Sequence, residues 1–234
     1  IFSLIEKKDI KTIDKIYITA SGGPFLKYSN SQLSNVTIRD ALNHPNWSMG
    51  KKISIDSSTM MNKVFEVIEA KNIFNIPYNQ ISILTHPKSY VHAIVKFNDG
   101  LTKILIHEPD MKIPIYNSIY LLDKKKVNSK PLNINILNNL EFNKIDYKKF
   151  PLTKILSLLP KYNSLFETAL ISINDYFVQK FLNKKIDYKN LVKLINKYSN
   201  DKNFTKFRKI PVKNVKEIYK IRDYVSFKLN TLGI

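Results

Sequence analysis

Residues 44–66 read HPNWSMGKKISIDSSTMMNKVFE and pass from a loop through an extended run into a helix. The loop carries a histidine, a proline and the sole tryptophan of the chain. Lys52–Ile55 alternates polar and branched apolar residues, which predicts an extended segment. From Ser58 to about Phe74, apolar residues recur at the i, i+3, i+4 and i+7 positions of a helix with one buried face. Asp56 or Ser57 is suited to cap the start of that helix.

Donor groups gather around the start of this helix. Ser57 lies where free backbone amides and the helix dipole favour an anion. Asn62 and Lys63 follow within the first turns, and Ser21 lies at the end of a predicted strand. Hydroxyl, amide and ammonium groups all donate to phosphate oxygens, so together these residues predict a site for a phosphorylated substrate. Taken singly, each one fits a cap, a turn or a solvated surface at least as well.

Glu66 and the histidines leave more than one interpretation open. As a ligand of Mg²⁺ or Mn²⁺, Glu66 needs further oxygen ligands, and the sequence offers no convincing partner nearby. The loop with His44 and Trp47 is either structural or a lid that closes over a ligand. His86 and His92 lie between predicted strands, where they are structural or support the site.

Alternating, β-branched segments predict four strands. Ser21-Gly22-Gly23-Pro24 forces a sharp exit from the first strand and brings its backbone close to neighbouring chain. Asn98-Asp99-Gly100 predicts a hairpin between the last two strands, and the last three strands suggest a small, largely antiparallel sheet. The predicted strands are Lys15–Ala20, Gln80–Leu84, Val91–Phe97 and Leu101–His107.

The whole chain is predicted to be an α+β protein in three parts. Residues 1–121 form a substrate- and metal-binding domain with a small, mostly antiparallel sheet flanked by helices. Residues 122–150 are polar and form a linker, with some local structure around 134–140. Residues 151–234 form a C-terminal helical bundle. The predicted helices outside 58–74 span 37–42, 113–121, 152–159, 164–183, 188–198 and 212–229.

Composition narrows the classes of function. The 234 residues include no cysteine, which excludes disulfides and thiolate chemistry, and no apolar run is long enough to span a membrane. The net charge of +19 raises the alternative of a basic nucleic-acid-binding module. However, the basic residues are spread along the chain and are mostly lysine, as in a protein with a general Lys, Asn and Ile bias. We therefore expect no nucleic acid and no membrane among the partners.

Several motifs together resemble the 1-deoxy-D-xylulose 5-phosphate reductoisomerase family. They are residues 44–66, Ser21-Gly22-Gly23-Pro24-Phe25, His86-Pro87-Lys88-Ser89 and Glu108-Pro109-Asp110-Met111, in family order. The resemblance implies conversion of 1-deoxy-D-xylulose 5-phosphate to 2-C-methyl-D-erythritol 4-phosphate in the non-mevalonate isoprenoid pathway. It also implies NADPH and Mg²⁺ or Mn²⁺ as cofactors.

The resemblance also implies roles for particular residues. Substrate contacts would come from Ser21, His44, Ser57, Asn62 and Lys63, and Trp47 would lie on the mobile loop over the substrate. Glu66 would bind the metal and face the substrate, with His44, Lys63 and Glu66 as the catalytic group. Met49, Gly50 and Met111 would lie near the nicotinamide end of NADPH.

The chain also departs from the family. No glycine-rich dinucleotide-binding fingerprint is present, and Ile1-Phe2 stands directly after the position where the family has its other metal carboxylates. Val64 replaces a usual glycine, and Asn174-Asp175 replaces a usual Asn-Glu. We therefore expect this fragment alone to be inactive and to bind metal poorly.

Three further expectations accompany the resemblance. The sheet region would form a homodimer. The location would be bacterial cytoplasm, or a plastid if the source is eukaryotic. The alternative within enzymes is another metal-dependent phosphosugar isomerase or aldolase.

Overall fold

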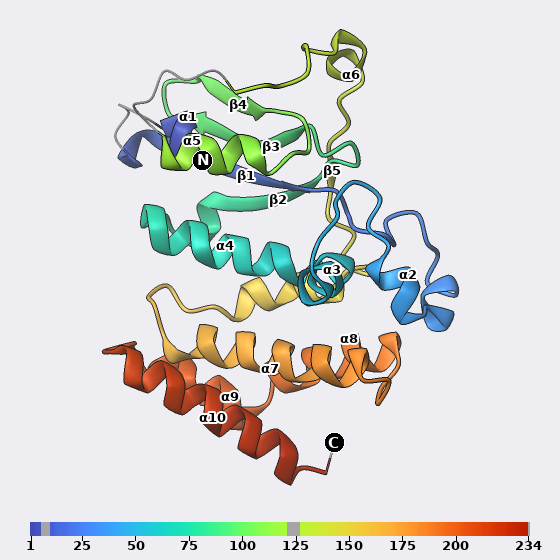
Figure 1. The fold of residues 1–234 in the computed structure, drawn as a ribbon. Helices are drawn as coiled ribbons and strands as arrows, with labels where there is room; N and C mark the ends of the chain where they lie inside the picture. The colour runs from blue at the N-terminus through green and yellow to red at the C-terminus, as the bar shows by residue number, and fades with distance from the viewer. Residues whose placement is uncertain (6–9, 121–126, 234) are drawn as a thin grey trace.

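A five-stranded mixed sheet forms one end of the molecule (Figure 1). The computed structural model of the chain describes residues 1–5, 10–120 and 127–233. The strand order is β4-β3-β1-β2-β5. The strands span Ile13–Ala20 (β1), Ile81–Thr85 (β2), Val91–Phe97 (β3), Thr102–Ile106 (β4) and Asn143–Lys144 (β5).

The first strand lies at the centre of this sheet. β1 runs parallel to β2 and antiparallel to β3, while β3 and β4 form the predicted hairpin. The α+β class and the mostly antiparallel sheet are thereby confirmed, and β1 lies between β2 and β3. β5, which the sequence did not predict, adds a short antiparallel pair to β2 from within the expected linker.

Helices and the loops between them make up most of the remaining described residues. The predicted helices at 37–42, 113–121, 164–183, 188–198 and 212–229 are confirmed with small shifts, and the segment at 152–159 is a 3₁₀ helix. Leu121 and the first part of the expected linker, 122–126, lie outside the described residues. The α-helices are Phe2–Ile5 (α1), Ile38–Leu42 (α2), Lys51–Ser58 (α3), Met61–Phe74 (α4), Lys112–Ile119 (α5), Ile134–Asn138 (α6), Leu165–Leu182 (α7), Tyr188–Ser199 (α8), Lys202–Thr205 (α9) and Val215–Thr231 (α10). The 3₁₀ helices are Ile10–Thr12, Gln32–Asn35, Tyr78–Gln80, Pro151–Leu158 and Lys206–Lys209.

The segment around residue 58 differs most from the prediction. Lys52–Ile55 is not extended but belongs to α3, which begins after Gly50 and ends at Ser58. The chain then breaks at Met60, whose φ of 63° lies in the left-handed region, and α4 begins at Met61. Neither Asp56 nor Ser57 caps α4, because both lie in the last turns of α3.

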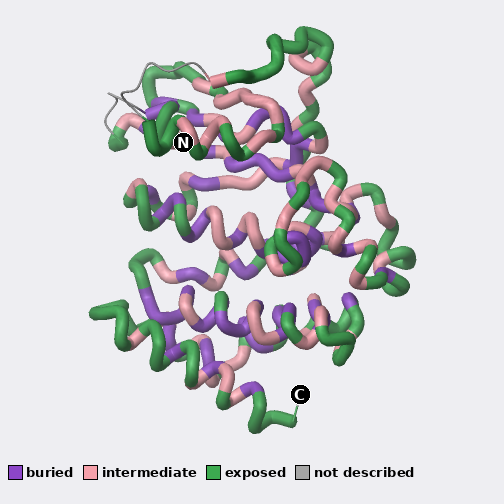
Figure 2. Tube along the Cα trace, viewed as in Figure 1, coloured by how far each residue is buried: buried purple, intermediate pink, exposed green. Residues whose placement is uncertain are grey.

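Helix α4 lies between two hydrophobic cores (Figure 2). Val67 and Ala70 pack with the sheet residues, whereas Met61, Val64 and Ile68 pack with the C-terminal helices. Helix α4 therefore has two buried faces, one more than the sequence predicted. This position fixes α4 between the sheet above it and α7 below it in Figure 1.

Two further features bear on the organisation of the chain. The larger core joins residues from the first half, such as Phe25 and Ile55, to residues of the C-terminal helices, such as Phe166 and Phe177. Within residues 1–5, 10–120 and 127–233, no helix has both the length and the apolar character that a membrane span requires.

Candidate functional site

A cleft of about 430 Å³ opens where β1 ends, beside the start of α4 and the β3–β4 hairpin. Nine of the ten residues that the sequence singled out line it: Ser21, His44, Trp47, Met49, Ser57, Asn62, Lys63, Glu66 and Met111. These residues come from segments that are far apart in the chain. Gly50 is not among the lining residues, and it lies exposed at the N-terminal cap of α3.

The exit from β1 brings Ser21 close to the end of α3. Gly23 has a φ of +64°, and a Cβ at this position would lie 2.7 Å from the carbonyl oxygen of Ser57. A side chain would therefore clash with backbone as well as strain its own conformation. The glycine lets two parts of the cleft wall approach each other, as the sequence predicted for this turn.

His44 connects the β1 exit to the loop that follows it. Its Nε2 lies 3.0 Å from Ser21 Oγ. Its Nδ1 accepts hydrogen bonds from the backbone N–H groups of Asn46 and Trp47, at 3.2 and 3.1 Å. Burial first, and then the charge of Lys63, hold the pKa of His44 below its usual value. The imidazole is therefore neutral near pH 7.

The loop is also fastened to the sheet. The Asn46 side chain donates to the Pro87 carbonyl at 2.8 Å and to Ser89 Oγ at 3.0 Å. The Trp47 ring meets the edge of His92, and the His92 ring stacks on His107 with centroids 3.6 Å apart. These contacts hold Trp47 half-buried at the mouth of the cleft.

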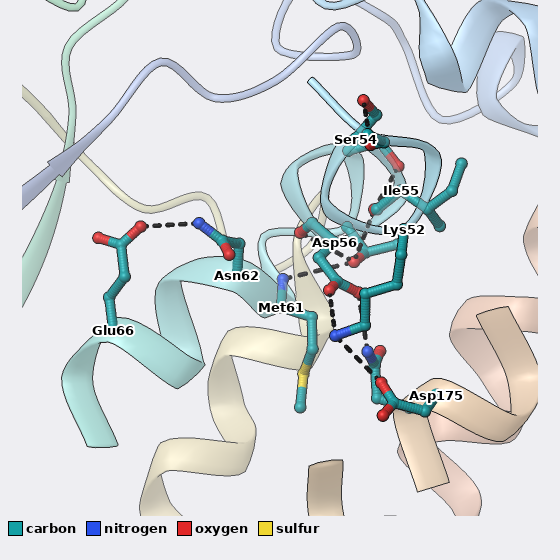
Figure 3. A network of polar contacts seen from close by, with 12 residues as sticks. Lys52, Ser54, Ile55, Asp56, Met61, Asn62, Glu66 and Asp175 are labelled. Atoms are coloured by element: carbon teal, nitrogen blue, oxygen red, sulfur yellow. Dashed lines mark hydrogen bonds and ion pairs between the residues drawn. The ribbon is translucent and has the colours of Figure 1, made fainter. Parts of the chain in front are cut away.

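Glu66 lies on α4 with its carboxylate held by two neighbours. Asn62 Nδ2 donates to one oxygen at 2.7 Å (Figure 3). Lys63 Nζ donates to the other oxygen, also at 2.7 Å. The Lys63 side chain is 15% exposed and that of Glu66 33% exposed, so this ion pair is only partly screened by water. The side chains of Asn62, Lys63 and Glu66, which lie within about one turn in the sequence, thus form one hydrogen-bonded cluster.

The fit of this cluster to a divalent cation is incomplete. Within the described residues, no group of three or more His, Cys, Asp or Glu side chains could hold a metal ion. Mg²⁺ and Mn²⁺ prefer several oxygen ligands, and Glu66 supplies a single carboxylate. The described residues therefore do not make a complete metal site.

The prediction that Ser57 lies at the start of a helix is wrong. Ser57 lies in the last turn of α3, at the negative end of that helix dipole, and not in the first turn of α4. Positive charge in the cleft wall comes instead from the ammonium of Lys63. Gly23 and Tyr188, which donates to the Ser58 carbonyl at 2.8 Å, hold this end of α3 in place.

A second polar cluster holds α3 against the C-terminal helices (Figure 3). The buried Asp56 carboxylate binds Lys52 Nζ at 2.8 Å and accepts from Asn174 Nδ2 at 2.7 Å. Lys52 also pairs with Asp175 at 3.0 Å. Burial raises the pKa of Asp56 despite the bonds from Lys52 and Asn174 that lower it. Asp56 directly precedes the cleft-lining Ser57 in sequence, but none of these four residues lines the cleft.

The structure adds lining residues that the sequence did not mark. His107 and Ser89 both line the cleft, as do the apolar residues Val91, Leu105 and Pro114. His92, which the sequence left as structural or supporting, belongs to the wall through its stack on His107. His86 is instead structural, since it is buried, binds the Glu141 carbonyl and stacks on Phe142.

The fold and cleft define a class of protein: an α+β protein with a polar cleft, carrying one Lys–Glu ion pair, between a mixed sheet and a helical region. Two family profiles then match the chain. The 1-deoxy-D-xylulose 5-phosphate reductoisomerase C-terminal domain matches residues 1–74, and the DXP reductoisomerase C-terminal domain matches residues 106–225. The chain belongs to the 1-deoxy-D-xylulose 5-phosphate reductoisomerase family.

Relatives and solved structures agree with this assignment. The reductoisomerase of Pelagibacter ubique is 52% identical over 234 residues, covering 100% of this chain and 60% of the relative. That of Clostridium novyi is 39% identical, covering 98% of this chain and 60% of the relative. A DOX-P reductoisomerase solved with NADPH, fosmidomycin and magnesium has a TM-score of 0.83 at 33% identity, covering 95% of this chain and 56% of that one. The Zymomonas mobilis enzyme with NADPH has a TM-score of 0.84 at 28% identity, covering 99% and 58%.

The chain therefore spans about 60% of the length of these curated relatives.

Proposed function

We propose that the protein carrying this chain is an NADPH- and divalent-metal-dependent reductoisomerase. It converts 1-deoxy-D-xylulose 5-phosphate to 2-C-methyl-D-erythritol 4-phosphate in the non-mevalonate isoprenoid pathway. Family membership supports this proposal, together with the cleft that gathers nine of the ten singled-out residues. The complexes of similar enzymes with NADPH and magnesium suggest the same cofactors for this protein.

The donor groups of the cleft would hold the phosphate and hydroxyl oxygens of the substrate. Ser21, Ser57 and Asn62 supply neutral donors, and Lys63 supplies a charged one. A hydrogen bond to a charged group contributes roughly 1.5–3 kcal/mol, so four such bonds would bind a phosphate ester firmly. Their binding energy fixes the orientation of the reacting carbons.

The remaining lining residues would shape the reaction space. Met49 and Met111 present apolar surface for the nicotinamide end of NADPH, which supplies the hydride. Trp47 closes the mouth of the cleft and excludes water. Glu66 would contribute one ligand to the divalent cation and face the substrate. We derive no step through the cation, because the described residues do not complete its site.

We also propose an assembly and a location for this protein. β4 is an edge strand of the sheet, and its exposed Ile104 together with Leu101 offers an apolar edge for a second copy of the chain. A homodimer through this edge would protect it. The bacterial relatives support a cytoplasmic location, with a plastid as the alternative for a eukaryotic source.

The test compares two glutamates one turn apart on α4. Glu66→Gln should abolish NADPH oxidation that depends on 1-deoxy-D-xylulose 5-phosphate and metal, measured on the protein that carries this chain. Glu69→Gln is the matched control, because Glu69 is exposed and does not line the cleft. Normal turnover by Glu66→Gln, or equal losses in both variants, would contradict the role of Glu66.

A further inference from the structure

The hydrogen bonds around His44 have a direction that the ring chemistry determines. Its Nδ1 accepts from two backbone N–H groups, those of Asn46 and Trp47. A nitrogen that accepts carries no proton, and a neutral imidazole has one proton in all. The proton therefore sits on Nε2, and the Nε2–H group donates to Ser21 Oγ across 3.0 Å.

This direction fixes the role of the Ser21 hydroxyl. Its oxygen accepts from His44 and also from the backbone N–H of Gly23, at 3.1 Å. A serine oxygen has two lone pairs, and these two donors use both of them. The hydroxyl hydrogen is then the remaining bonding group. Ser21 lines the cleft, so this hydrogen is available to an acceptor there.

The electrostatic surroundings of His44 are consistent with a neutral ring. Burial and the nearby Lys63 ammonium both disfavour the imidazolium form. A second proton on Nδ1 would also point at the N–H groups of Asn46 and Trp47 and break both bonds. The observed geometry is therefore that of one tautomer.

We propose that His44 is a positioning residue that makes the Ser21 hydroxyl an obligate donor into the cleft. The position beside Ser21 then suits a ligand oxygen that carries no hydrogen and only accepts hydrogen bonds, as in an ionised phosphate. The same imidazole ring fixes the first turn of the loop that carries Trp47. This inference rests on the proposed function for the identity of the oxyanion, but its hydrogen-bond direction does not.

The first experiment observes the tautomer directly. Imidazole ¹⁵N NMR of the 234-residue chain near pH 7 should show His44 with an unprotonated Nδ1 and a protonated Nε2. Assignment is secured by loss of the signal in a His44 variant. A proton on Nδ1 would overturn the proposal, because Ser21 would then donate to His44 and present only its remaining lone pair to the cleft.

The second experiment separates the two nitrogens with a matched pair of variants. His44→Asn retains an acceptor near the Nδ1 position but loses the donor to Ser21. His44→Gln retains a donor near the Nε2 position but loses the backbone acceptor. Inorganic phosphate affinity is measured by titration, and loop anchoring by hydrogen exchange of the Asn46 and Trp47 amides.

The two variants should have opposite effects. His44→Asn should weaken phosphate binding roughly 2- to 10-fold with little change in amide exchange, as expected for one lost hydrogen bond. His44→Gln should bind phosphate within about twofold of the unchanged chain, while the two amides exchange roughly 2- to 10-fold faster. Equal effects of the two variants on phosphate binding, or the reverse order, would overturn the proposal.

The results distinguish this inference from the proposed function. If the unchanged protein that carries this chain does not bind phosphate, the proposed function and the oxyanion part of the inference both fail. The tautomer and the amide exchange still decide the direction of the His44 bonds. If phosphate binds but Nδ1 carries the proton, the proposed function stands and the inference fails.

Discussion

Gly23 shows how a single residue sets the shape of the cleft. Its positive φ and the Ser57 carbonyl beside it both exclude a side chain. We expect Gly23→Ala to lower the free energy of unfolding by about 1–3 kcal/mol from backbone strain, with a further loss from the clash. Urea unfolding measures the change.

Gly100 provides the control for this prediction. It also has a positive φ, of +86°, but nothing lies within 4 Å of a Cβ placed on it. Gly100→Ala should therefore show the strain without the clash and be the less destabilising variant. Equal losses from the two substitutions would mean that the contact with Ser57 contributes nothing.

His92 should make stability depend on pH. Burial, as the largest cause, lowers its pKa from 6.5 to about 4. Between these values the unfolded chain binds a proton that the folded chain does not, so stability falls as the pH falls through this window. The loss should be on the order of 1–2 kcal/mol after allowance for solvent screening of a partly exposed ring. Urea midpoints measured from pH 7 to pH 4 should decline less steeply in His92→Gln than in the unchanged chain.

Local motifs in the sequence marked some residues of the cleft and missed others. Ser21, Asn62, Lys63 and Glu66 were found because local motifs mark them, and the structure brings them to one cleft. His107 was missed because its signal is a contact with His92 across two strands, and no spacing in the sequence displays that pairing.

At the scale of elements, the sequence was most misleading at α3. Lys52-Ile53-Ser54-Ile55 alternates as a strand does, but the buried residues Ser54, Ile55 and Asp56 are consecutive, which a half-exposed strand does not allow. Tertiary contacts of Asp56 and Ile55 overrode the local pattern. The break at Met60 was also unpredictable, because methionine seldom adopts a positive φ and no glycine or proline marks the place.

The attachment of α3 to α7 gives a prediction for these two elements. Asn174→Ala removes a donor from the buried Asp56 carboxylate and should lower the free energy of unfolding by about 1–3 kcal/mol. Asp175→Ala is the neighbouring control, since its side chain is 50% exposed, and should cost about 1 kcal/mol or less. Chemical denaturation of both variants tests the order. A larger loss in Asp175→Ala would show that the exposed ion pair, and not the buried amide, connects the helices.

For the whole molecule, the hairpin and the C-terminal helices followed from local periodicity, but the order of the strands did not. β1 and β3 pair across 70 or more positions of sequence, as Ile18 with Ala93 shows, and no local signal records such a pairing. The proposed division of the chain at residues 121 and 151 remains a prediction. The two cores that share α4 argue that both parts nevertheless unfold together.

Cooperative unfolding can be tested with one substitution in each core. Ile16 lies in the core beneath the sheet and Ile173 in the core of the C-terminal helices, and both are fully buried. Ile16→Val and Ile173→Val should each cost about 0.5–1.5 kcal/mol. Far-UV circular dichroism reports chiefly on the helices, while fluorescence reports on Trp47 beside the sheet. Because α4 belongs to both cores, each variant should shift both signals to the same lower urea midpoint. Two separate transitions, each moved only by the substitution in its own core, would show that α4 does not couple the sheet to the helices.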